Sequence, residues 1–475
     1  MHLNMSTESK KHLPNRDSVT AINDDGSRYI IHPADVKGRF TFWRQFSAYF
    51  LILLYAALPW IDIGGYPALF LDTDAMRFHF LGLTFGSQDL WLAFFLISGL
   101  GFGLFYVTAL LGRIWCGWAC PQTVFLEHVY RRVERWIEGD AIKRRKLDTS
   151  GWGFERIIKR SLKHVIFAGL SLALAHMFMA YFVSVPGLWK MMQEAPAENW
   201  KVFVFVFAYA AVLYFNFAWF REQLCIVICP YGRLQSALID EHSMVIGYDE
   251  KRGEPRGKAK DVNAGDCIDC NRCVQVCPTG IDIRQGLQME CIGCSACIDA
   301  CDTVMDRLKR PRGLVRYDSM EGLEGRKTKY VRPRMILYTV LLMIGAGVLL
   351  VSLRGLGDAT ITTWRAPGSP YYVDADVVRN QFMVRVTNTK NDKGVYSLQL
   401  DTAQPGIEVR GVDEAFEIAG NGDFVRPVIV LASKETFTGA FSMVVKILDE
   451  EGETIGERPL EFIGPSPRLL NKEKE

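Results

Sequence analysis

Apolar residues gather in five long runs, and polar or charged segments separate these runs. Each run is close to the roughly 20 residues that a helix needs to cross a hydrocarbon core about 30 Å thick. The first 45 residues are polar and lack the pattern of a signal peptide, so the first run is expected to stay in place as an anchor. We therefore predict a bundle of five transmembrane helices, at Phe46–Ile63, Leu90–Leu111, Val165–Val185, Trp200–Phe220 and Met335–Leu353.

The orientation of this bundle follows from its positive charges, because Lys and Arg accumulate in cytoplasmic loops. Loop 64–89 contains only Arg77 and loop 186–199 contains only Lys190, whereas segment 112–164 includes "RR" and "KRRK". This bias predicts that the N-terminus and segment 221–333 are cytoplasmic and that the chain beyond residue 354 is outside.

The pattern changes again near Tyr371, where short runs of β-branched residues alternate with polar ones. Examples are "FMVRVTNT", "VYSLQLDT", "FVRPVIVLAS" and "FSMVVKILDE", which are separated by turn-forming residues. About seven strands over roughly 100 residues suggest an immunoglobulin-like β-sandwich. No catalytic constellation is visible there, so an interaction or stabilising role is favoured.

Composition agrees with alternating membrane and aqueous parts, since 49 % of the residues are hydrophobic and the net charge is only +2. The basic residues lie in loops beside apolar runs, which argues against nucleic-acid binding. All 12 cysteines lie between Cys116 and Cys301. Such clustering favours metal or redox chemistry on the reducing side of the membrane over a disulfide scaffold.

Eight of these cysteines form CxxCxxCxxxCP followed by CxxCxxCxxxC within residues 267–301. This pattern resembles bacterial two-cluster ferredoxins over residues 258–305, in which three closely spaced thiolates and one from the other motif hold each [4Fe–4S] cluster. A pair of zinc sites is the alternative, but zinc motifs favour CxxC pairs, often with histidine. Asp302 replaces the proline that usually follows the last ligand. The resemblance assigns Cys267, Cys270, Cys273 and Cys301 to one cluster and Cys291, Cys294, Cys297 and Cys277 to the other.

The remaining four cysteines form two CxxxCP motifs, "CGWACP" and "CIVICP", each placed just after an apolar run. Their spacing puts each pair on one helix face, and the proline that follows suits the first turn of a new, amphipathic helix. Two spans, a CxxxCP motif and a surface helix occur twice, about 109 residues apart, as in a parallel repeat. We therefore predict that the four thiols, Cys116, Cys120, Cys225 and Cys229, converge at one site.

Soft thiolates favour Cu(I), zinc or a further iron–sulfur cluster, and a reversible disulfide or plain buried cysteines are other interpretations. His176 lies near the middle of the third predicted span, with Met177 and Met179 beside it and Met191 and Met192 in the following loop. A histidine inside a membrane is a functional candidate, so these residues could relay copper, although Met often only fills a core. His128 and His164 are expected to be ordinary surface residues.

The complete order of five spans, twin CxxxCP motifs, ferredoxin insert and outer β-domain resembles the CcoG/FixG/RdxA family of cytochrome oxidase accessory proteins. The implied organisation is a cytoplasmic segment (1–45), spans one to four with the CxxxCP motifs (46–256), a two-cluster ferredoxin domain (257–310), a linker with the fifth span (311–354) and a periplasmic immunoglobulin-like domain (355–475). The resemblance implies a multi-pass protein of the bacterial inner membrane.

The same resemblance implies that the protein reduces Cu(II) to Cu(I) and supports assembly of cb-type (C-type) cytochrome c oxidase. It implies two [4Fe–4S] clusters, with copper at the four CxxxCP cysteines. Its implied partners are a cytoplasmic electron donor, a copper chaperone or transporter, oxidase assembly factors, membrane lipid and conceivably a second copy in a homodimer. Two rival functions are electron exchange with quinol and a non-enzymatic assembly scaffold whose clusters are structural.

Overall fold

The computed structural model describes residues 30–73, 76–86, 90–354, 359–374, 376–390, 392–412 and 414–466. Residues 1–29 of the predicted N-terminal segment and residues 355–358 of the predicted outer domain lie outside this description. The described residues form two compact units. One contains the chain up to Ile61 together with Phe94–Ala346, and the other contains Asp62–Ala93 together with the chain from Gly347.

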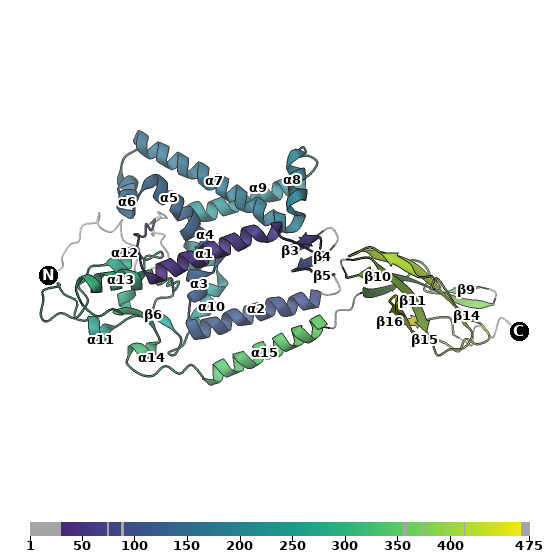
Figure 1. Cartoon of the computed structure of the whole chain (residues 1–475). Coiled ribbons are helices and arrows are strands. Elements are labelled where there is room, and N and C mark those ends of the chain that lie inside the picture. The colour runs from purple at the N-terminus through teal and green to yellow at the C-terminus, as the bar shows by residue number, and fades with distance from the viewer. Residues whose placement is uncertain are drawn as a thin grey trace. The chain divides into compact units, whose positions relative to one another are not determined.

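Four helices among the described residues are long and apolar enough to cross a membrane (Figure 1). Between 6 and 28 % of their most apolar window is buried by protein, so most of this apolar surface faces outward, as lipid contact requires. The helix at the third predicted span begins at Phe154, before Val165, and the helix at the fourth covers Trp200–Phe220, as predicted. These helices are α2 (Leu90–Leu111), α7 (Phe154–Val183), α9 (Trp200–Phe215) with its π-helical extension Asn216–Phe220, and α15 (Pro333–Arg354).

The first predicted span differs from the prediction. Helix α1 (Arg39–Ala57) begins and ends earlier than Phe46–Ile63, and it is not among the helices that are apolar enough to span. A 3₁₀ turn (Leu58–Trp60) and a short strand follow it, since Pro59 cannot continue the hydrogen-bond ladder. The five-helix count is therefore not confirmed.

Short helices link the long ones at the ends that carry the CxxxCP motifs. Pro121 and Pro230 each occupy the first position of a new helix, as predicted, because a fixed φ suits that position. These helices are α3 (Ile114–Trp118), the continuous run α4 (Pro121–Phe125), η4 (Leu126–Tyr130) and α5 (Arg131–Glu138), α6 (Ala141–Thr149), the π-helical η6 (Leu224–Ile228) and α10 (Pro230–Leu238). Another short helix, α8 (Val185–Gln193), connects α7 to α9 at the opposite end.

The ferredoxin region is built around an antiparallel strand pair, β6 (Val245–Tyr248) with β7 (Val315–Asp318). Its longest helix is α13 (Ala296–Arg307), whose Asp299 accepts hydrogen bonds from the backbone N–H groups of Phe40 and Thr41 and thereby caps α1. Its other elements are α11 (Glu250–Gly253), α12 (Arg272–Gln275), η7 (Ile283–Gln285) and α14 (Met320–Leu323).

The second unit begins with two small antiparallel sheets between α1 and α2. They contain β1 (Asp62–Ile63) with β2 (Tyr66–Pro67), and β3 (Leu69–Asp72) with β4 (Arg77–Phe80) and β5 (Leu83–Phe85). Arg77 on β4 forms an ion pair with Asp423 of the C-terminal β-domain, so these hairpins and that domain belong to one unit.

The C-terminal domain is a sandwich of two antiparallel sheets, in the orders β12-β14-β10-β8 (with β9 beside β10) and β13-β11-β15-β16. This agrees with the predicted immunoglobulin-like fold, although the strands begin at Ala359, before Tyr371. The strands are β8 (Ala359–Arg365), β9 (Tyr372–Val373), β10 (Val377–Asn388), β11 (Gly394–Asp401), β12 (Ile407–Arg410), β13 (Phe416–Ile418), β14 (Asp423–Ser433), β15 (Phe441–Leu448) and β16 (Thr454–Phe462).

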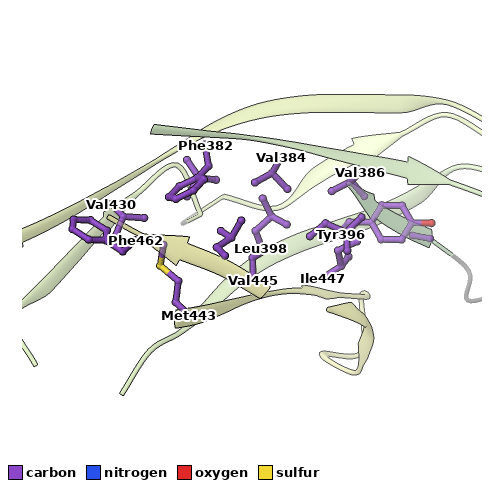
Figure 2. Packing of buried hydrophobic residues seen from close by; sticks show 14 of the residues in the cluster. Phe382, Val384, Val386, Tyr396, Leu398, Val430, Met443, Val445, Ile447 and Phe462 are labelled. Atoms are coloured by element: carbon purple, nitrogen blue, oxygen red, sulfur yellow. The ribbon is translucent and has the colours of Figure 1, made fainter. Parts of the chain in front are cut away.

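Alternation along the strands builds the core of this sandwich. On β10 every second side chain is buried, among them Phe382, Val384 and Val386, because successive residues of a strand point to opposite faces. Figure 2 shows them with Leu398 and Val445 from the opposing sheet. The candidate membrane helices are thus continuous apolar runs, whereas the strands of the β-domain alternate, as the sequence pattern predicted.

Candidate metal centres

The first set of ferredoxin cysteines surrounds one pocket. Cys267, Cys270, Cys273 and Cys301 all line it, together with apolar residues such as Met305 and Leu314. Burial raises the pKa of the Cys273 thiol to about 12, against a smaller lowering by Arg284. The pKa of Cys301 is likewise raised to about 12, first by burial and then by the charge of Cys273.

The second set surrounds a neighbouring pocket that is more apolar. Cys277, Cys291, Cys294 and Cys297 line it, along with Ile246, Ile281, Ile283 and Ile292, and Cys273 reaches it as well. Burial raises the pKa of Cys291 to about 12 and that of Cys297 well above its ordinary value. Four thiols in such surroundings cannot all ionise unless a cation joins them. A [4Fe–4S] cluster supplies iron and takes four thiolates, so both donor sets fit this group.

Helix α13 connects the two pockets. It carries Cys297 and Cys301 one turn apart, and each lines a different pocket. The helix continues through Asp302 to Arg307 instead of ending at the usual proline. The Asp302 carboxylate accepts a hydrogen bond from the N–H of Gly313 at 3.0 Å, which holds the following turn against the helix.

The first CxxxCP motif lies directly on the loop of the second pocket. Gly117 is so close to this loop that an added Cβ would stand 2.8 Å from the backbone N of Cys294. Trp118 donates its indole N–H to the carbonyl of Gly293 at 3.2 Å, and Cys116 packs against the apolar group that includes Cys294. Only glycine allows this close approach of two backbones.

Arg113, which lies three residues before Cys116, joins the two CxxxCP motifs and the second ferredoxin motif. Its guanidinium donates to the carbonyl of Cys291 at 3.3 Å and to the carbonyl of Met289, both in the second cluster loop. It also donates to the carbonyl of Gly232 at 2.7 Å, just after the second CxxxCP motif. The planar fork of arginine suits such a three-way contact.

The two CxxxCP repeats exchange matching hydrogen bonds. Gln122, two residues after Cys120, bonds Asn216 at the end of the helix that leads to the second motif. Tyr231, two residues after Cys229, bonds Thr108 in the helix that leads to the first motif. The reciprocity agrees with the predicted parallel repeat.

These contacts bring Cys116, Cys120, Cys225 and Cys229 together, and we call the set the four-thiol site. Gln235 donates its amide N–H to the Cys116 sulfur at 3.2 Å. Burial raises the pKa of Cys116 to about 11 and that of Cys225 to about 12, and the charges of the other thiolates of the set contribute to both increases. Burial also raises the pKa of Cys120, partly offset by the backbone N–H groups of Gln122 and Thr123.

The spacing of the thiols limits what they could hold as a group. Within the described part of the chain, no three His, Cys, Asp or Glu side chains are placed closely enough to hold one metal ion. This holds for the four-thiol site and for both ferredoxin pockets alike.

A buried ionic network, which sequence reasoning missed, joins the two repeats. Glu134 pairs with Arg221, and Arg131 pairs with Glu222 at 3.1 Å, so the helix after the first motif is tied to the residues before the second. Arg131 also donates to the carbonyl of Pro278, beside Cys277. The i, i+4 spacing of Glu127 and Arg131 was the one available signal. Other buried members are Glu138, Arg144 and Lys163.

Burial alone would raise the pKa of Glu134, but the charges of Arg221, Lys163 and Arg144 outweigh it and hold this pKa well below its usual range. A carboxylate that is buried among several cations stays ionised because removing its charge would leave them uncompensated. The network is therefore a charged clamp between the two repeats.

The histidines and methionines lie elsewhere. His176 donates Nδ1–H to the Leu172 carbonyl of its own helix, and Met179 packs in a small apolar group with Ala175 and Val206. Among the contacts of the described residues, none joins His176, Met177, Met179, Met191 or Met192 to the four-thiol site. His164 is exposed, as expected, and bonds Tyr214.

His128 corrects the expectation of a surface residue. Its side chain is buried between Tyr49 and the ionic network, because η4 turns this face of the helix inward. Burial first and the charge of Arg44 second lower its pKa to about 4, so the imidazole is neutral at pH 7.

Family models of iron–sulfur domains match the regions of the chain that contain these cysteines. The family model of a 4Fe–4S dicluster domain matches residues 220–320, and that of a 4Fe–4S binding domain matches residues 91–140. The model of the IG-like fold at the C-terminus of FixG matches residues 349–465. Protein RdxA of Cereibacter sphaeroides is 36 % identical over 401 residues, which cover 80 % of this chain and 85 % of RdxA.

The chain belongs to the FixG/RdxA family. Nitrogen fixation protein FixG of Rhizobium meliloti is 34 % identical over 437 residues, or 82 % of each chain. Ferredoxin-type protein NapH of Haemophilus influenzae is 26 % identical over 261 residues, which cover 52 % of this chain and 78 % of NapH. A crystal structure of a FixG-related protein from Vibrio parahaemolyticus aligns with 16 % identity and a TM-score of 0.21, covering 23 % of this chain and 97 % of that one. This FixG-family chain is thus an iron–sulfur membrane protein with an immunoglobulin-like C-terminal domain.

Proposed function

We propose that this protein passes electrons through its two ferredoxin clusters to the four-thiol site, where Cu(II) is reduced to Cu(I). The observation that carries the proposal is the contact between Gly117 and the backbone of Cys294. It places the first CxxxCP motif directly on the loop of the second cluster, so no intervening domain separates donor and acceptor. The contact supports electron transfer to this site, and the family resemblance supports copper as the acceptor.

The cysteines that line each ferredoxin pocket are the ligands of one cluster in this proposal. Cys267, Cys270, Cys273 and Cys301 hold one [4Fe–4S] cluster, and Cys277, Cys291, Cys294 and Cys297 hold the other. These clusters supply single electrons when reduced, and each Cu(II) takes one to become Cu(I). The electrons come from a cytoplasmic reductant that the family resemblance implies.

The protein's own residues hold this relay in place. Arg113 and Trp118 fix the second cluster loop against the first motif through the carbonyls of Met289, Cys291 and Gly293. Arg113 also bonds the Gly232 carbonyl after the second motif. Thiolates are soft ligands that stabilise Cu(I) over Cu(II), which makes reduction at this edge favourable. Cu(I) then leaves to a copper chaperone or transporter that serves assembly of cb-type cytochrome c oxidase, with the β-domain as a contact for assembly factors.

The membrane orientation is part of the proposal. Helix α1 is 19 residues long, which corresponds to about 28 Å at the rise of an α-helix, and Phe46, Phe50 and Leu53 on it are exposed. We take it as a fifth span despite its lower apolarity. With five spans, the N-terminus and the β-domain lie on opposite sides, and the Lys/Arg bias puts the ferredoxin region in the cytoplasm and the β-domain in the periplasm. Reporter fusions at residues 38 and 86, which flank α1, should report opposite compartments. The same compartment at both points would refute α1 as a span.

The deciding experiment is anaerobic reduction of Cu(II) by the purified full-length protein in detergent, with a chemical reductant as the electron source. The wild type should produce Cu(I) in a burst that matches its reduced clusters, and C225A/C229A should lose this burst while both ferredoxin clusters remain. Tyr231→Phe is the matched control, because it alters the same helix but keeps all four thiols. Unchanged copper reduction by C225A/C229A would refute the assignment of the site.

The second candidate function is electron exchange with quinol, and similarity to a ferredoxin-type protein over 261 residues favours electron transfer in general. The same preparation separates the two functions when a soluble quinol analogue replaces the chemical reductant or when a quinone replaces Cu(II). Rapid turnover with quinol or quinone and no reaction with Cu(II) would favour this second function.

A further inference from the structure

The CxxxCP spacing occurs three times in this chain, as "CGWACP", "CIVICP" and "CVQVCP". The third copy, Cys273 to Pro278, belongs to the ferredoxin region and lies at the two pockets described above. In every copy the first cysteine lies in a short helical turn and the second follows that turn directly before the proline. The two membrane copies therefore repeat the backbone of a segment that carries cluster ligands, but in the ferredoxin copy Cys273 and Cys277 belong to different clusters.

A single ion and a cluster need different arrangements of the same four thiolates. Four sulfurs around a single ion lie about 3.8 Å apart, since metal–sulfur bonds near 2.3 Å point to the corners of a tetrahedron. A cubane cluster separates its four thiolates further, because each binds a different iron. Two hydrogen bonds bring the two membrane motifs to one place. Gln235, on the helix after the second motif, donates to the Cys116 sulfur at 3.2 Å, and Arg113, just before the first motif, donates to the Gly232 carbonyl at 2.7 Å.

The sulfurs also receive hydrogen bonds of the kind that tune clusters. Gln235, whose side chain is fully buried, donates to Cys116 at 3.2 Å, and backbone N–H groups at the start of α4 point to Cys120. The 4Fe–4S binding-domain model that matches residues 91–140 covers only Cys116 and Cys120, two of the four ligands that a cubane needs. The second repeat supplies the missing pair, Cys225 and Cys229.

We propose that the four-thiol site holds a third [4Fe–4S] cluster, with two ligands from each membrane repeat. The cluster lies beside the loop of the second one and ends the electron path. This assignment replaces the direct binding of copper by the four thiolates, as in the proposed function, with reduction of Cu(II) at the edge of the cluster. Only this last statement rests on the proposed function, since the presence of the cluster is independent of its substrate.

The test is a count of iron and acid-labile sulfide in the full-length protein, purified anaerobically in detergent and reconstituted with Fe(II) and sulfide. Wild type should contain twelve iron and twelve sulfide per chain, four of each for three clusters. C225A/C229A should contain eight of each and keep the paramagnetic resonance signals of the two ferredoxin clusters. Eight of each in the wild type, unchanged in the variant, would overturn the proposal, as would copper or zinc in place of the extra iron.

A second variant tests the same site without removing a cysteine, so that loss of the fold in C225A/C229A would not leave the proposal without a test. Gln235→Leu removes a hydrogen bond that favours the more negative, reduced cluster, so one of three midpoint potentials should fall and the other two should stay. No shift in any signal would contradict the assignment. The two hypotheses also fail separately. Twelve irons without Cu(II) reduction would refute only the proposed function, and eight irons with Cu(II) reduction would refute only the third cluster.

Discussion

The first CxxxCP motif lies against the ferredoxin region, whereas the second turns part of its surface outward. Gly117 is buried on the backbone of Cys294, but Val227 and Ile228 are 40 % and 60 % exposed. Both motifs nevertheless have the same local form, a short helical turn, a cysteine and a proline that starts the next helix. A repeated segment can thus keep one chemistry while one copy connects to the electron source and the other faces lipid or a partner.

The charged clamp between the repeats offers the largest expected effect. Glu134→Gln leaves Arg221, Arg144 and Lys163 without their shared carboxylate, and breaking a buried pair costs about 3–5 kcal/mol. Thermal unfolding in detergent should detect this loss. Glu155→Gln is the control, because Glu155 is exposed and pairs only with Lys159 of its own helix. Equal stability of both variants would show that the clamp does not hold the repeats together.

Glu134 also predicts a pH dependence. Its pKa in the folded protein is well below the ordinary value near 4.3, so its contribution to stability is complete above that value. As the pH falls below about 4.3, the unfolded state binds a proton that the folded state does not, and stability decreases. The wild type should therefore lose stability with acid more steeply than Glu134→Gln. Parallel pH curves would contradict this.

The next effect concerns the contact that distinguishes the first motif. Gly117→Ala places a methyl group against the backbone of Ile292 and Cys294, and such overpacking costs about 1–3 kcal/mol. Because the displaced loop carries cluster ligands, iron per chain should fall as well. Gly103→Ala on α2 is the control, since its added Cβ meets no atom within 4 Å. Full iron content in Gly117→Ala would show that the close approach is dispensable.

The smallest effect tests the symmetry of the comparison. Tyr231→Phe removes the hydrogen bond to Thr108, at about 1 kcal/mol. Gln122→Ala loses two hydrogen bonds to Asn216 and one to the Arg221 carbonyl, so its melting temperature should decrease further. A melting temperature of Tyr231→Phe equal to that of the wild type would show that its bond does not hold the repeats together.

Local pattern was sufficient for much of the architecture. Four of the five predicted spans, the helix starts at Pro121 and Pro230 and the alternating strands of the β-domain all agree with the structure. The two pockets are lined by the two sets of cysteines that the resemblance to two-cluster ferredoxins implies. These features depend on neighbours a few residues away, which a sequence displays directly.

The predictions from sequence were wrong or incomplete where contacts with residues far along the chain determine a helix start or the burial of a side chain. Helix α1 was placed too late, because its start depends on a cap from Asp299, which is 258 residues from Thr41. His128 was expected at the surface, since nothing in its neighbourhood reveals that Tyr49 and Arg44 cover it. The clamp of Glu134 and Arg221 was missed for the same reason, as 87 residues separate them.

Apolar runs thus indicated four of the helices that are long and apolar enough to cross a membrane, and proline indicated two helix starts, because these properties follow from local geometry and from the cost of burying polar groups. Only the tertiary structure decided that the first motif meets the Cys294 loop, that Arg113 joins three motifs and that buried charges tie the repeats together. Such contacts depend on how whole helices pack, and many residues share in that packing, so no single stretch of sequence records it.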